Sequence, residues 1–244
     1  MACHRKIRTV IASTARGFTL VELAVTLFIV ALVLGSILVP LTTQVEQRKV
    51  SDTQKALDEI KEALMGFAIA NGRLPCPAQS STNGVEKAVC SAVVDRAGFI
   101  PWVTLGVSKL DAWGHVFRYS VTYTYASSTK FDLTTSGAID VQTRYGGPTF
   151  PLANSVPAVV MSHGKNGYGS VDDVGFVQET PGDWTVPTHT DEYANSTTAI
   201  LFVSRVPQAP GAGPSTNGGE FDDIVVWISP NILFNRMVAA GKLP

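Results

Sequence analysis

The chain has 244 residues, 45% of them hydrophobic, and its 19 lysine and arginine residues nearly balance its 20 aspartate and glutamate residues. This length allows one large folded domain or two small ones, each with a hydrophobic core. The formal net charge of -1 provides no extended positive surface for a polyanion. We therefore do not expect nucleic acid as a partner.

The first 17 residues form a basic leader that contains no acidic residue. Its four cations are Arg5, Lys6, Arg8 and Arg16. Basic residues that flank an apolar segment tend to stay on the cytoplasmic side of a membrane. The leader therefore predicts that the N-terminus lies in the cytoplasm and that the C-terminal bulk of the chain is translocated.

The next segment, residues 18–41, is almost entirely apolar, and Glu22 is its single charged residue. As a helix this segment would be about 36 Å long, which is enough to cross a bilayer. No signal-peptidase site of small residues follows it, so we expect it to remain attached as a membrane anchor. A carboxylate in such a helix costs about 2.5–3.5 kcal/mol at the bilayer centre and less near the interface. Glu22 is therefore either tolerated at the interface, near the positive end of the helix dipole, or paired with a fixed cation.

The residues around Glu22 resemble a known processing signal. The sequence ARG-FTLVEL, in which Gly17 precedes Phe18 and Glu22 follows, is similar to the cleavage site of type IV prepilins and type II secretion pseudopilins. The resemblance implies that prepilin peptidase cuts after Gly17 and that Phe18 becomes an N-methylated terminus. It also implies that Glu22 meets the terminal amine of a neighbouring subunit during fibre assembly. The implied partners are prepilin peptidase, other pilin or pseudopilin subunits, and the inner membrane.

Beyond the apolar segment the sequence becomes amphipathic. Apolar residues recur at helical spacing at Leu57, Ile60, Leu64 and Phe67. We expect one helix over residues 18–72, of which 18–41 forms the transmembrane segment or fibre core and 42–72 packs on the following domain. It should end at Asn71-Gly72. Pro40 is expected either to kink this helix or to mark the membrane exit.

Residues 73–244 are expected to form a β-rich periplasmic or extracellular domain. Short apolar or alternating runs, separated by glycine, asparagine and proline, predict an antiparallel sheet. The expected strands lie at residues 115–126, 130–135, 157–162, 199–206 and 223–229. The tail, residues 231–244, is expected to add a short helix. This plan is the α+β fold of type IV pilins, with a long N-terminal helix packed on an antiparallel sheet.

The cysteines predict a disulfide in the part of the chain that is expected to be exported. Cys3 lies in the leader, which leaves Cys76 and Cys90 as an isolated pair. An even pair in an exported chain predicts a disulfide. A zinc site would need further ligands, and neither cysteine belongs to a C-x-x-C pair or lies near a suitably spaced histidine.

The domain contains turns that resemble those of major pseudopilins. DAWGHVFRYSV is similar to their D-P-W-G signature, with Ala112 in place of the proline, and SHGKNGYGS and GGEFDDIVVW are similar to two later turns. In that family the corresponding loop binds calcium, which implies Asp222 and Asp223 as carboxylate ligands. Asn166 replaces the usual aspartate, and a long insertion separates the two later turns. The alternative is that both acids cap a strand or face water. No role is assigned to Asp172, Asp173, Asp191 or Glu192, because their spacing matches no EF-hand loop.

Catalysis is not expected, although His163 and His189 accompany many acids and serines. The sequence contains no G-x-S-x-G elbow, no H-E-x-x-H motif and no Walker loop. The first hypothesis is therefore a structural subunit, a minor pilin or pseudopilin of a type IV pilus or a type II secretion pseudopilus. The second is a signal-anchored periplasmic binding module or enzyme that does not polymerise. The role of Glu22 distinguishes the two.

Overall fold

The computed structural model describes residues 17–127, 131–178, 189–209 and 219–243, and for residues 36–41 it describes the backbone alone. The leader, apart from Gly17, thus lies outside the described residues. The chain divides into two compact units, residues 1–47 and residues 48–244.

The first helix, α1 (Leu20–Asn71), contributes residues to both units. It begins after Thr19, whose carbonyl accepts a hydrogen bond from the Leu23 N–H at 3.1 Å. It ends before Gly72, which has a φ of 74° and donates its N–H to the Ala68 carbonyl at 2.7 Å. Glycine adopts this left-handed conformation without a steric penalty, which explains why the helix stops there. The backbone remains helical through Pro40.

The C-terminal half of α1 supplies the main hydrophobic core of the second unit. Leu57, Ile60 and Leu64 have no exposed surface. They belong to one buried cluster with residues of the central sheet, including Tyr119 and Val160. Three of the four residues of the predicted amphipathic stripe are therefore buried as expected, whereas Phe67 is only partly buried.

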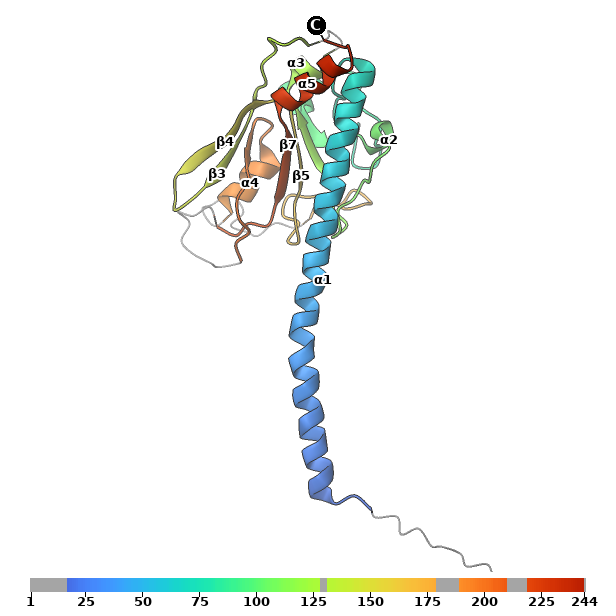
Figure 1. The fold of residues 1–244 in the computed structure, drawn as a ribbon, viewed down its shortest axis with the longest axis vertical. Coiled ribbons are helices and arrows are strands. Elements are labelled where there is room, and N and C mark those ends of the chain that lie inside the picture. The colour runs from blue at the N-terminus through green and yellow to red at the C-terminus, as the bar shows by residue number, and fades with distance from the viewer. Residues whose placement is uncertain (1–16, 128–130, 179–188, 210–218, 244) are drawn as a thin grey trace, which may run out of the picture. The chain divides into compact units, whose positions relative to one another are not determined.

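The central sheet has four antiparallel strands in the order β1-β2-β5-β7. Figure 1 labels two of them, β5 and β7, which lie side by side. Its strands are β1 (Ala97–Phe99), β2 (Arg118–Val121), β5 (Ala158–Ser162) and β7 (Ile224–Ile228). Alternate residues of β5 contribute to two different cores: Ala158 and Val160 to the cluster with α1, and Val159 and Met161 to a second cluster. This explains why β5 is buried along its whole length.

The second core lies between the central sheet and a three-stranded sheet of order β4-β3-β6. Its strands are β3 (Ile139–Arg144), β4 (Thr149–Val156) and β6 (Leu201–Val203). β3 and β4 form an antiparallel hairpin, whereas β3 and β6 are parallel. The expectation of a single antiparallel sheet was therefore too simple. β4 is an edge strand, and its Phe150 and Leu152 are exposed.

Two expected strands differ from the structure: the first is correct over Arg118–Val121 alone, and the second is wrong. The run 115–126 leaves the sheet after Val121, and α3 (Tyr123–Ala126) follows. Tyr125 of this helix is buried against Phe131, with ring centroids 4.9 Å apart. The run 130–135 begins at a residue outside the described set and continues as a turn. In it the carboxylate of Asp132 accepts hydrogen bonds from the Thr134 N–H and hydroxyl at 2.8 and 2.7 Å.

The remaining helices are short. They are a 3₁₀ turn, η1 (Val93–Asp95), and the helices α2 (Trp102–Leu105), α4 (Thr190–Thr197) and α5 (Pro230–Ala239). The tail helix predicted from the sequence is α5, which has a proline at its start, where the missing N–H costs no hydrogen bond.

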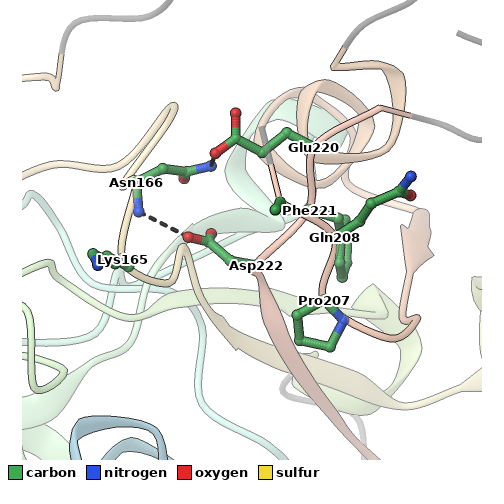
Figure 2. Close-up of a pocket in the computed structure, with 8 residues that line it drawn as sticks. Lys165, Asn166, Pro207, Gln208, Glu220, Phe221 and Asp222 are labelled. Atoms are coloured by element: carbon green, nitrogen blue, oxygen red, sulfur yellow. Dashed lines mark hydrogen bonds between the residues drawn. The ribbon is translucent and has the colours of Figure 1, made fainter. Parts of the chain in front are cut away.

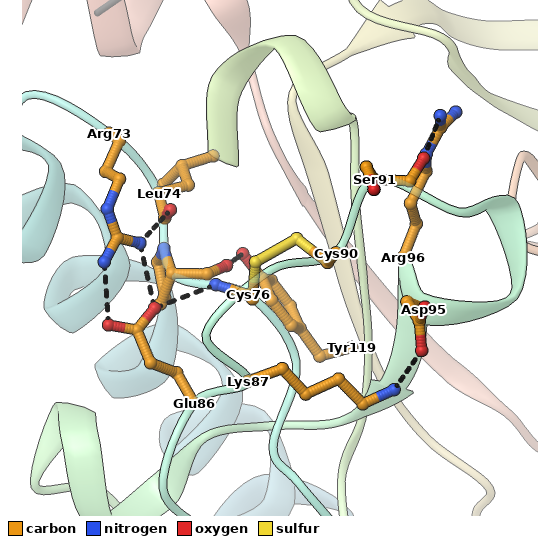
Figure 3. The surroundings of a disulfide bond; sticks show 11 residues. Arg73, Leu74, Cys76, Glu86, Lys87, Cys90, Ser91, Asp95, Arg96 and Tyr119 are labelled. Atoms are coloured by element: carbon orange, nitrogen blue, oxygen red, sulfur yellow. Dashed lines mark hydrogen bonds and ion pairs between the residues drawn. A yellow bond between two sulfur atoms is a disulfide. The ribbon is translucent and has the colours of Figure 1, made fainter. Parts of the chain in front are cut away.

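A disulfide joins Cys76 to Cys90, as the pair predicted, with Cα atoms 5.8 Å apart. Figure 3 shows its surroundings. The Arg73 guanidinium donates two hydrogen bonds to the Glu86 carboxylate, at 2.8 and 2.9 Å, and this carboxylate also accepts the Cys76 N–H at 3.1 Å. The buried Tyr119 hydroxyl donates to the Pro75 carbonyl at 3.0 Å. The loop closed by the disulfide is thus also held by charged hydrogen bonds.

Candidate functional site

The start of α1 combines a helix cap with the predicted processing residues. Gly17 and Phe18 are exposed, and the Thr19 hydroxyl oxygen accepts the Glu22 N–H at 3.2 Å. A threonine followed three residues later by a glutamate is the capping-box pattern, which satisfies otherwise unpaired N–H groups at a helix start. The position of Glu22 in the first turn also favours its negative charge. Among the described residues, the Glu22 carboxylate has no hydrogen-bond or ion-pair partner.

The described apolar side chains of this first unit are exposed. Phe18 is 79% exposed and Leu20 is 87% exposed, and the large apolar residues that follow as far as Leu34 are also exposed. A continuous apolar surface of this kind is a feature of proteins that bind another chain or a lipid. Within the described residues, no helix is both long enough and apolar enough to cross a membrane.

The second unit contains a cluster of three carboxylates from two separate segments, of which Glu192 and Asp223 are buried and Asp222 is partly buried. Glu192 lies on α4, and Asp222 and Asp223 precede β7. One oxygen from each lies within 4.8 Å of the others. The sequence predicted the two aspartates as a pair but left Glu192 without a role.

Each carboxylate of this cluster has one oxygen that accepts hydrogen bonds and one buried oxygen without a donor. Glu192 Oε1 accepts the Asn166 side-chain amide at 2.9 Å and the Asp222 N–H at 3.0 Å. Asp222 Oδ2 accepts the Asn166 N–H at 2.9 Å, and Asp223 Oδ2 accepts the Asn195 side-chain amide at 2.8 Å. The other three oxygens, Glu192 Oε2, Asp222 Oδ1 and Asp223 Oδ1, are buried without a hydrogen-bond donor. This arrangement fits a bound cation, because a buried carboxylate oxygen without a partner is costly.

The electrostatics of the cluster also favour neutralisation. Burial raises the pKa of Asp222 to about 6. Burial also raises the pKa of Glu192. The pKa of Asp223 is raised well above its usual range by burial and by the nearby Glu192 charge. Three such groups disfavour one another's ionised forms unless a cation or protons compensate them.

Two histidines lie beside these acids. His163 Nδ1 is 3.9 Å from Asp223 Oδ1, and His189 Nδ1 is 3.8 Å from Glu192 Oε2. Burial, with the nearby Arg118 charge, lowers the pKa of His163 to about 3, so its ring is neutral. The oxygen atoms of the cluster fit a divalent cation, but an imidazole is not part of the all-oxygen set that calcium prefers.

A cavity of about 420 Å³ opens next to Asp222. Figure 2 shows Asn166, Glu220 and Asp222 on one side of it and Pro207 and Gln208 on the other. Of the three carboxylates, Asp222 lines this cavity, and Glu192 and Asp223 do not.

The N-terminal segment also has a match among known families. Residues 13–38 match the family model described as the prokaryotic N-terminal methylation motif. The chain carries a prepilin-type cleavage and methylation segment. Gly17, Phe18 and Glu22 all lie inside this prepilin segment. No match was found among curated proteins or among solved structures.

Outside the prepilin segment, the D-A-W-G turn, residues 111–114, is held in place by hydrogen bonds to the Asp111 carboxylate. The Asp111 carboxylate accepts the N–H groups of Trp113 and His115, both at 2.9 Å, and the Ser162 hydroxyl at 2.6 Å. Burial alone would raise the pKa of Asp111, but the hydrogen bonds from His115 and Ser162 outweigh it and lower this pKa. Because the Ser162 hydroxyl donates to a carboxylate and not to a histidine, it is not arranged as the nucleophile of a hydrolase.

The other acids that received no role are engaged elsewhere. Asp191 accepts hydrogen bonds from Arg144 at 2.9 Å and from Arg205 at 2.8 Å, and Asp173 pairs with Lys109 at 2.6 Å. The Asp172 carboxylate accepts two backbone N–H groups of its own turn. None of these three belongs to the carboxylate cluster. Sequence reasoning missed Glu192 because its only local signal is weak: His189, the N-cap of α4, is followed by Glu192 and Asn195 at a spacing of three residues, which places them on one side of the helix.

Proposed function

We propose that this chain is the precursor of a fibre subunit, a minor pilin or pseudopilin. Prepilin peptidase cleaves it between Gly17 and Phe18, and Phe18 then becomes N-methylated. The observation that carries this proposal is the methylation-motif match over residues 13–38, which includes both residues. The precursor is anchored in the inner membrane by residues 18–41, a segment whose last six side chains lie outside the described part of the chain. Its N-terminus lies in the cytoplasm, and the subunit then joins a type IV pilus or a type II secretion pseudopilus.

In this proposal, the Glu22 carboxylate recognises the neighbouring subunit during fibre assembly. Its carboxylate lacks a partner among the described residues, and it is followed by an exposed apolar surface. A carboxylate in apolar surroundings recovers much of its desolvation cost when a cation reaches it. The methylated terminal amine of the next subunit supplies that cation, so helices associate in one register. Polymerisation buries the apolar surface. Head-to-tail contacts that do not close into a ring produce a helical filament.

Mass spectrometry of the purified mature protein tests the processing step. We expect a chain that starts at Phe18 and carries an N-methyl group, and we expect Gly17→Ala to leave the full-length precursor. A mature protein that keeps Met1 would contradict the proposal. It would favour the alternative of a signal-anchored periplasmic module or enzyme that does not polymerise.

Three variants test the assembly step. Glu22→Ala should be processed normally but be strongly depleted from sheared fibres, whereas Glu59→Ala, which removes an exposed glutamate of the same helix, should be incorporated normally. Thr19→Ala removes the helix cap, at a cost of about 0.5–2 kcal/mol, but retains the Glu22 carboxylate. If Thr19→Ala were depleted as strongly as Glu22→Ala, assembly would depend on the structure of the helix start and not specifically on the Glu22 carboxylate.

A further inference from the structure

A second cavity, of about 450 Å³, lies where β6 stops pairing with β3. It is lined by residues 143–146, at the end of β3 and in the following turn, and by residues 205–208, which follow β6. None of these lining residues is acidic, whereas Arg144 and Arg205 are cationic. A concave site of this size can hold a small ligand or the end of a peptide.

The backbone of β3 is unpaired on the side of this cavity. The Asp140 N–H and the Gln142 carbonyl make hydrogen bonds of 2.8 Å to the residues that flank β6. In a parallel pair every second residue bonds to the same neighbour, so Arg144 is the next residue of β3 to face this side. Within the described part of the chain, no backbone hydrogen bond joins Arg144 to residues 205–208. The cavity therefore contains a short strand edge that an extended peptide can join.

The Arg144 side chain has a free donor at the same cavity. Its Nε donates to both oxygens of Asp191, at 2.9 and 3.1 Å, and its Nη1 donates to the Gly147 carbonyl at 2.7 Å. Its Nη2 has no partner among the residues that the structure describes. Because the other bonds already hold the guanidinium in place, little side-chain entropy is lost when Nη2 binds a ligand.

Two guanidinium groups at this cavity share one hydrogen-bonded carboxylate. Asp191 accepts from Arg144 and from Arg205, whose side chains are only 19% and 6% exposed. Burial lowers the pKa of Arg205, and the Arg144 charge adds to this effect, although Asp191 opposes it. An anion at the cavity relieves the repulsion between two such partly buried cations.

We propose that this cavity binds the C-terminal end of an extended peptide from another protein. The terminal carboxylate accepts a hydrogen bond from Arg144 Nη2, and the amide groups that precede it pair with the open edge of β3. Arg205 contributes its charge alone, since its Nε, Nη1 and Nη2 all donate within the domain. One free donor suits a carboxylate, whereas a phosphate group offers three strong acceptor oxygens.

The occupant is not the end of this chain or of a second copy. Leu243, next to the C-terminus, is buried and belongs to the main hydrophobic core with α1, so this end is not available as an extended peptide. The site is also independent of processing and fibre assembly, because all its residues belong to the second unit.

Selection from a random peptide pool tests this site. The full mature chain, immobilised in detergent, is incubated with a pool of random pentapeptides that have free C-terminal carboxylates, and separately with the same pool carrying C-terminal amides. The wild type should retain the free-acid pool at least about 10-fold more strongly, which is the low end of what one hydrogen bond to a charged group contributes. Equal retention of the two pools, or retention of neither, would overturn the proposal.

Two arginine variants separate this site from general attraction to anions. Arg144→Gln should abolish the preference for the free-acid pool. Arg236→Gln, which removes a more exposed arginine on α5, should keep it. Equal loss in both variants would show that the preference reflects overall charge, and an unchanged preference in Arg144→Gln would exclude Arg144 as the anchor.

Photo-crosslinking of the wild type gives a result that does not depend on a folded variant. Retained peptides that carry a diazirine side chain next to the C-terminus should label residues 143–146 or 205–208, as located by mass spectrometry of the digested chain. Labelling confined to other parts of the chain would overturn the assignment of this cavity.

Discussion

Removal of the Cys76–Cys90 disulfide should destabilise the second unit strongly. The two cysteines are separated by 14 positions, and in the chain-entropy model a closed loop of about 15 residues contributes about 3 kcal/mol at 25 °C. Both side chains are almost fully buried, so alanine replacements introduce no unpaired polar atom. In a domain of this size, about 3 kcal/mol corresponds to a fall in Tm of about 6–12 °C.

Urea unfolding of the mature protein, followed by tryptophan fluorescence, measures this effect. The double variant Cys76→Ala/Cys90→Ala should lose about 3 kcal/mol relative to the oxidised wild type. A reductant should lower the wild-type midpoint by a similar amount and leave the midpoint of the variant unchanged. A loss below about 1 kcal/mol at unchanged slope would refute the reasoning. It would mean that the Arg73–Glu86 hydrogen bonds already restrict this loop.

Two other substitutions give predictions that the same urea assay can check. Leu64→Ala removes a fully buried core side chain of α1 and should lower the free energy of unfolding by about 2–5 kcal/mol. The control Glu59→Ala, on the exposed face of the same helix, should change it by less than about 0.5 kcal/mol. Equal effects of the two substitutions would refute the assignment of the buried face. Gly164→Ala should cost about 1–3 kcal/mol, because Gly164 has a φ of +62° and a Cβ would lie 2.3 Å from the backbone oxygen of Asp222. A Gly164→Ala protein with wild-type stability would show that this turn adjusts freely.

The parts of the fold that the sequence predicted are those with a periodic apolar pattern. The stripe from Leu57 to Leu64 repeats at helical spacing, and β5 and β7 are short apolar runs, so each pattern indicated its element. β3 and β4 were missed because IDVQTR and TFPLANSV are largely polar and β4 contains Pro151. They form a hairpin at the edge of the second sheet, where only one side needs apolar residues.

The candidate sites differ in how far apart their residues lie in the sequence, and this decides whether they could be predicted. A peptidase recognises a linear segment, so Gly17, Phe18 and Glu22 could be predicted from a few consecutive residues. The carboxylate cluster, by contrast, depends on chain topology, since α4 brings Glu192 to Asp222 from a segment 30 positions earlier. Asn195 illustrates the same limit. Its N-S-T sequence suggests a glycosylation sequon, but its side chain is fully buried and hydrogen-bonded to Asp223 and Val203.

The edge strand β4 has a consequence for solubility. A subunit that is crowded among many copies of itself risks pairing exposed sheet edges into aggregates. The exposed side chains of Phe150 and Leu152 increase this risk. Pro151 lies between them, opposite Gln142, and because it has no N–H, it interrupts the row of donors that an added strand would require. The proline therefore makes β4 a poorer template for an added strand than an edge strand with a complete row of N–H groups.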